Sequence, residues 1–88
     1  MNYSVIDNQP LNGEMISYVV GRERPSIRFL GQAFSLRHGI NMAASLKPDF
    51  IFLNLMMPGE DCFKLLKNIR VLLPEVKVSV LSLWNMGA

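Results

Sequence analysis

The chain has few of the residues on which several classes of protein depend. It contains 88 residues, half of them apolar, and a single cysteine, Cys62. One cysteine excludes a disulfide framework and a cysteine-based zinc site, and it suits a reducing cytoplasm, where we expect the protein to be. Apolar runs such as Phe50–Leu53 are far shorter than the about 20 residues that a membrane span needs, and no signal peptide is indicated. We therefore expect one cytoplasmic domain over residues 1–88, with no membrane segment.

Acidic residues are also scarce, because seven Asp and Glu stand against nine Lys and Arg and give a formal net charge of +2. A basic chain invites a nucleic-acid interpretation. Lys64, Lys67 and Arg70 form a basic stripe at helical spacing, but such a stripe is ordinarily a solvated face, and no nucleic-acid motif accompanies it. We expect nucleic acid to be bound only through a separate output domain, if one exists.

Short apolar segments alternate with segments of helical periodicity. The last apolar segment has Val76, Val78 and Val80 alternating with polar residues, which indicates a partly exposed or edge strand. The third segment is continuously apolar, as in a strand buried on both faces of a parallel sheet. The predicted strands are Tyr3–Asp7, Ser26–Phe34, Phe50–Leu53 and Val76–Ser82.

Three amphipathic helices are predicted between these strands. The first begins at Pro10, is weakened by Gly13 and ends at Gly21, whereas the second ends near Lys47-Pro48. Asp61 or Glu60 caps the third, after a turn at Pro58-Gly59. The apolar stripes are Leu11, Met15, Tyr18 and Val19; then Leu36, Ile40, Ala43 and Ala44; then Phe63, Leu66, Ile69 and Leu73. The alternation predicts an α/β fold, a doubly wound parallel sheet with helices on both faces.

Small polar residues follow three of the predicted strands, namely Asp7-Asn8, Asn54 and Ser82. In an open parallel sheet, ligands bind outside the carboxyl ends of the strands. These residues, with the stretches Val5–Leu11, Lys47–Gly59 and Val78–Ser82, resemble the receiver domain of two-component response regulators. The resemblance implies a flavodoxin-like fold with strand order 2-1-3-4. The chain stops short of the family's fifth strand and its flanking helices, so we expect an incomplete receiver.

The resemblance also implies a role for each strand end. The family's phosphoryl acceptor is an aspartate, and here that position is Asn54, whose carboxamide cannot form an acyl phosphate. The family's magnesium ion is held by two acids and a backbone carbonyl, which correspond to Asp7, Asn8 and Met56. With one carboxylate left, we expect magnesium to bind weakly or not at all, so no cofactor is predicted. Ser82 matches the hydroxyl that bonds the phosphoryl group.

We therefore expect a pseudo-receiver that is not an enzyme and that acts through protein–protein contact or as a homodimer, independently of phosphorylation. Its predicted interface consists of Val80, Leu81, Leu83 and Trp84. The first alternative is a fragment of a phosphorylatable regulator with a helix-turn-helix DNA-binding output domain, in which Asn54 is an engineered or inactivating replacement. A small phosphatase or magnesium-dependent enzyme, which needs more carboxylates than Asp7, and a nucleic-acid-binding protein are further alternatives.

Overall fold

The computed structural model describes residues 1–81, and the predictions for Ser82, Leu83 and Trp84 lie outside this range. Strands and helices alternate along the chain, as the sequence predicts. Their order is β1 (Asn2–Ile6), α1 (Pro10–Glu23), β2 (Arg28–Ala33), α2 (Leu36–Leu46), β3 (Phe50–Asn54), α3 (Cys62–Leu72) and β4 (Lys77–Leu81).

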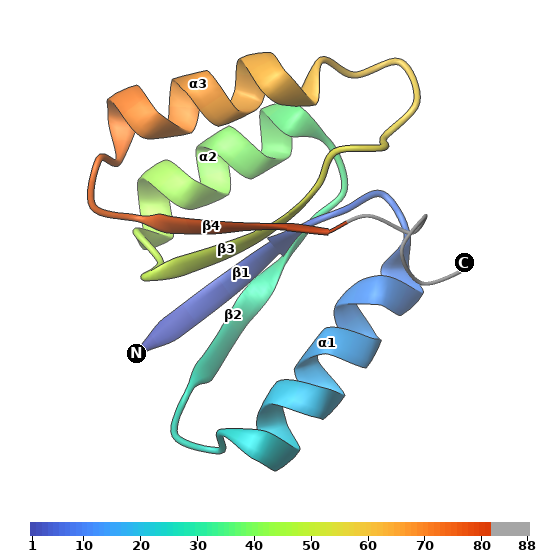
Figure 1. The fold of residues 1–88 in the computed structure, drawn as a ribbon, viewed down its shortest axis with the longest axis vertical. Coiled ribbons are helices and arrows are strands. Elements are labelled where there is room, and N and C mark those ends of the chain that lie inside the picture. The colour runs from blue at the N-terminus through green and yellow to red at the C-terminus, as the bar shows by residue number, and fades with distance from the viewer. Residues whose placement is uncertain (82–88) are drawn as a thin grey trace.

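The four strands form one parallel sheet in the order β2-β1-β3-β4, which confirms the predicted doubly wound fold. Helices α2 and α3 lie on one face of the sheet and α1 lies on the other (Figure 1). Strand β4 is at the edge of the described sheet, as its alternating sequence indicates. Its Val80 side chain is exposed, while Val78 is half-buried.

The core lies between the sheet and the α2–α3 layer. Ile6, Ile51 and Leu53 reach it from β1 and β3, and Leu65 and Ile69 reach it from α3. Cys62 is buried in the same cluster, as expected of a small apolar side chain there.

The opposite face is only half covered. A helix is about 10 Å wide and neighbouring strands are about 4.8 Å apart, so one helix covers about two strands. Since α1 contacts β2 and is the one helix on this face within residues 1–81, no helix of the described residues covers the part of the face over β3 and β4.

Three details of the predicted helices are wrong. Helix α1 continues through Gly21 to Glu23, and two residues of its predicted apolar stripe, Leu11 and Tyr18, are 62% and 60% exposed. Gly13 is the buried residue of α1, because the sheet approaches this helix closely there. In α3 the predicted stripe is confirmed for Ile69, Leu66 and Leu73, but Phe63 is exposed and Leu65, which the prediction omits, is buried.

Side-chain hydrogen bonds fix the ends of several elements. Asp61, and not Glu60, caps α3, because its Oδ1 accepts from the Lys64 backbone N–H at 3.0 Å. At the amino ends of β1 and β3, the Asn2 backbone N–H donates to Asp49 Oδ2 at 2.8 Å, and the Asp49 N–H donates to Asn2 Oδ1 at 2.9 Å. This reciprocal pair joins the two central strands at their start.

Candidate functional site

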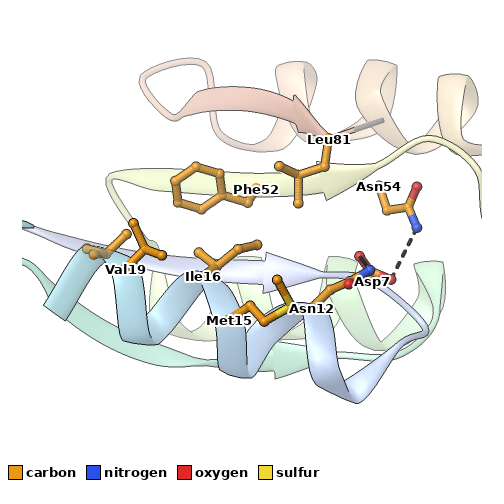
Figure 2. A pocket seen from close by; sticks show the side chains of 9 residues that line it. Asp7, Asn12, Met15, Ile16, Val19, Phe52, Asn54 and Leu81 are labelled. Atoms are coloured by element: carbon orange, nitrogen blue, oxygen red, sulfur yellow. Dashed lines mark hydrogen bonds between the residues drawn. The ribbon is translucent and has the colours of Figure 1, made fainter. Parts of the chain in front are cut away.

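The carboxyl ends of β1 and β3 bring Asp7 and Asn54 together, as the sequence analysis predicts. Asp7 directly follows β1 and Asn54 is the last residue of β3, and their side chains are 1% and 2% exposed. The Asn54 Nδ2 donates to Asp7 Oδ1 at 3.1 Å, a bond drawn as the dashed line in Figure 2. The position that corresponds to the phosphoryl acceptor therefore holds a buried amide, and this amide is hydrogen bonded to the Asp7 carboxylate.

Two further donors complete the surroundings of Asp7. The Gln9 backbone N–H donates to Asp7 Oδ1 at 2.9 Å, and the Asn12 Nδ2 donates to Asp7 Oδ2 at 2.8 Å. All three donors are uncharged, and each lowers the cost of burying the carboxylate. We call Asp7, Gln9, Asn12, Asn54 and Met56 the strand-end cluster.

Met56 joins this cluster through its backbone. Its N–H donates to Asn54 Oδ1 at 2.8 Å, while its side chain is exposed. The Asn54 amide thus uses its oxygen for the β3–α3 loop and its nitrogen for Asp7. Asn8 is exposed and does not line the pocket beside Asp7, so the structure does not bring it into the site.

Gln32 on β2 supports the cluster from the other side. Its Nε2 donates to the backbone carbonyls of Asp7 and Gln9, at 2.8 and 2.9 Å. Neither Gln32 nor Asn12 is among the site residues predicted from the sequence. The available signal was Gly13, because a glycine inside a helix often marks the close approach of another group.

An apolar groove of about 330 Å³ begins beside the strand-end cluster and runs along α1. In Figure 2, Met15, Ile16 and Val19 of α1 form one wall, and Phe52 and Leu81 lie across the groove. Leu81, a predicted interface residue, is half-buried here, whereas Val80 is 48% exposed.

The residues of the site do not fit a magnesium ion. Magnesium prefers several hard, anionic oxygen ligands in octahedral geometry. Asp7 is the one carboxylate of the cluster, and it already accepts three hydrogen bonds. The Asn54 side chain turns its nitrogen, a donor, toward Asp7, and residues 1–81 contain no group of three His, Cys, Asp or Glu that could hold a metal ion.

The site is thus an Asp–Asn pair at the carboxyl ends of the two central strands of a doubly wound parallel sheet. No family model matches the chain. It is 31% identical over 81 residues to the nitrate/nitrite response regulator protein NarL of Escherichia coli K12, an alignment that covers 92% of this chain and 37% of NarL. The chain has the fold of response-regulator receiver domains, and its sequence is similar to that of a response regulator.

Solved structures show the same fold. The RcsB protein of Salmonella enterica serovar Typhimurium, solved bound to promoter rprA, aligns with a TM-score of 0.83 and 23% identity, covering 94% of this chain and 43% of that one. The response regulator domain of Thermotoga maritima CheB aligns with a TM-score of 0.76 and 24% identity, covering 91% and 58%. The chain thus spans less than two thirds of each of these proteins. No helix within residues 1–81 has the length and apolar character needed to cross a membrane.

Proposed function

We propose that this receiver domain signals without accepting a phosphoryl group, through contact with another protein, and has no catalytic activity of its own. The observation that carries the proposal is the buried amide of Asn54 at the end of β3, hydrogen bonded to Asp7. An acyl phosphate requires a carboxylate nucleophile, and an amide nitrogen committed to a neighbouring carboxylate cannot serve as one.

The test is incubation of the protein with acetyl phosphate and Mg²⁺, followed by mass spectrometry of the intact chain. We expect no covalent phosphate on the wild-type protein. Asn68→Asp, which places a new carboxylate on an exposed position of α3, should also remain unmodified and controls for nonspecific labelling. Stoichiometric, Mg²⁺-dependent phosphate on the wild-type chain would refute the proposal.

Self-association through β4 is the contact that we propose first. Within residues 1–81, β4 pairs with β3 on one side only, and the exposed Val80 lies beside Leu81 on this strand. An unpaired strand edge with apolar side chains is a surface that a second copy can extend. The sequence analysis adds Leu83 and Trp84 to this interface, and both lie outside the described residues.

Light scattering coupled to size-exclusion chromatography tests the dimer. We expect a dimer that Val80→Glu converts to a monomer. Val71→Glu is the matched control, because Val71 is 81% exposed and lies on α3 and not on the strand edge, so the change should leave the dimer intact. A monomer at high concentration would contradict self-association.

The lengths of the relatives favour a second proposal, in which the domain is the regulatory part of a longer DNA-binding protein. The chain covers 37% of NarL and 43% of the RcsB chain that was solved on promoter DNA. Nucleic acid would then be bound by another domain. An open reading frame that continues past codon 88 into a helix-turn-helix would support this proposal, and a stop codon there would contradict it.

A further inference from the structure

The Asp7 side chain is 1% exposed and lies among uncharged groups. Its three donors are the Gln9 N–H, the Asn12 amide and the Asn54 amide, at 2.8–3.1 Å. Burying a carboxylate is strongly unfavourable unless hydrogen bonds or a cation compensate it. Here hydrogen bonds alone supply the compensation.

Asn54 can fill this role only as an amide. Its nitrogen donates to Asp7 and its oxygen accepts from the Met56 N–H, so both ends of the amide are used and its orientation is determined. A carboxylate at position 54 could still accept from Met56, but it would place two anionic oxygens about 3 Å apart, where they repel strongly unless a cation lies between them.

The same contacts join four elements of the sheet edge. Asn12 connects α1 to Asp7, Asn54 connects β1 to the β3–α3 loop, and Gln32 connects β2 to the β1–α1 loop. The β3–α3 loop is held again by Glu60, whose Oε2 accepts from the Leu36 N–H at the start of α2 at 2.7 Å. The two loops that follow β1 and β3, at the carboxyl ends of the strands, are therefore both held in place by side chains of the domain itself.

We propose that Asn54 and Asn12 replace a divalent cation in holding the Asp7 carboxylate, so that this edge keeps one arrangement with or without the ion. Both are positioning residues. The inference deepens the proposed function and rests on it: a domain that signals by contact alone presents this edge permanently, and neither Mg²⁺ nor phosphorylation changes it. Asn54→Asp should turn the same edge into a cation-dependent one.

The experiment is thermal unfolding of the 88-residue chain in EDTA and in 10 mM Mg²⁺. We expect the wild-type Tm to be equal in the two conditions. Asn54→Asp should lower the Tm in EDTA by about 10 °C, since it replaces a hydrogen bond by charge repulsion in a small domain. Mg²⁺ should restore a large part of that loss, because two carboxylates now face each other.

Two further variants separate the site from general effects. Asn12→Ala removes one donor without adding charge, so its Tm should fall in EDTA and show no Mg²⁺ response. Asn68→Asp makes the same chemical change on exposed α3 and should leave the Tm within about 2 °C of the wild type. If Asn54→Asp fails to fold, amide hydrogen exchange of Gln9 and Met56 in the wild-type protein still tests the inference, because both N–H groups should be equally protected in EDTA and in Mg²⁺.

A wild-type Tm, or protection of those two amides, that rises on adding Mg²⁺ would overturn the inference, and so would an Asn54→Asp variant as stable in EDTA as the wild type. These outcomes are separate from the labelling experiment. Phosphate on the wild-type chain would refute the proposed function and would leave the Tm comparison unaltered.

Discussion

The side-chain amide of Gln32, on β2, lies against the bare Cα of Gly13, on α1, so closely that a Cβ at position 13 would overlap it. Gln32 is held in place by the carbonyls of Asp7 and Gln9, to which its Nε2 donates. The absence of a side chain at Gly13 therefore allows a strand residue to support the loop that carries Asp7.

Gly13→Ala should destabilise the domain by about 1–3 kcal/mol, because the new methyl group displaces Gln32 and leaves two loop carbonyls without their donor. Urea unfolding followed by circular dichroism measures the change. Gly21→Ala is the control: Gly21 also lies in α1, but nothing is within 4 Å of a Cβ there, and Ala should stabilise the helix by about 0.5–1 kcal/mol. Equal effects at the two glycines would show that Gln32 adapts without cost.

Glu60→Ala should cost about 1 kcal/mol, since the carboxylate accepts from a backbone N–H in the first turn of α2, where the helix dipole favours a negative charge. The same unfolding measurement applies, with Glu75→Ala, at an exposed position outside any helix or strand, as the control. An equal loss of unfolding free energy in both variants would contradict a specific role of Glu60 in joining the β3–α3 loop to α2.

Burial raises the pKa of the Tyr3 hydroxyl above its ordinary value. The unfolded chain then loses this proton at a lower pH than the folded chain, so the stability from a neutral Tyr3 is complete below about pH 10 and declines as the pH rises through the folded pKa. Tyr3→Phe should therefore lose less stability than the wild type between about pH 9 and 11 in urea titrations. Tyr18→Phe, on the exposed side of α1, should follow the wild-type curve, and identical curves for all three proteins would contradict the prediction.

Ser4→Ala should stabilise the protein by up to about 1 kcal/mol, because the Ser4 hydroxyl is fully buried in β1 and its oxygen has no hydrogen-bond partner within residues 1–81. Differential scanning calorimetry would show a higher Tm. Ser79→Ala, at an exposed position of β4, should change stability by less than about 0.5 kcal/mol. A Tm for Ser4→Ala below that of the wild type would contradict the prediction and would show that the Ser4 hydroxyl makes a stabilising contact.

The sheet could be predicted from the sequence because its signals are local. The continuous apolar run Phe50–Leu53, the valine alternation in β4 and the polar residues after two strands each specify a position in a parallel sheet, and the strands take those positions. The predicted burial of the run on both faces is only partly confirmed, because Phe50 and Phe52 are half-buried. The pairing of Asp7 with Asn54 follows from the same rule, since the carboxyl ends of β1 and β3 are neighbours.

The helix faces and the supporting residues could not be predicted in this way. In α1, the residue that meets β2 most closely is Gly13, which a search for large apolar residues passes over, whereas the large residues Leu11 and Tyr18 are exposed. Gln32 acts on a loop 23 to 25 residues earlier in the chain, and such a long-range bond leaves no periodic signal. Asn12 is five residues from Asp7, and nothing in the sequence distinguishes it from a solvent-facing residue of the helix.

The two central strands are joined at both ends by an Asn–Asp pair, and the partners are 47 residues apart in each pair: Asn2 with Asp49, and Asp7 with Asn54. If β3 slipped along β1 by one residue, both pairs would separate together, and Ile51 and Leu53 would turn from the core to the opposite face. The alignment of the two strands is thus specified twice by polar contacts and once by apolar ones. A β1–β3 pairing shifted by one residue would lack all three contacts, which disfavours that alignment against the native one.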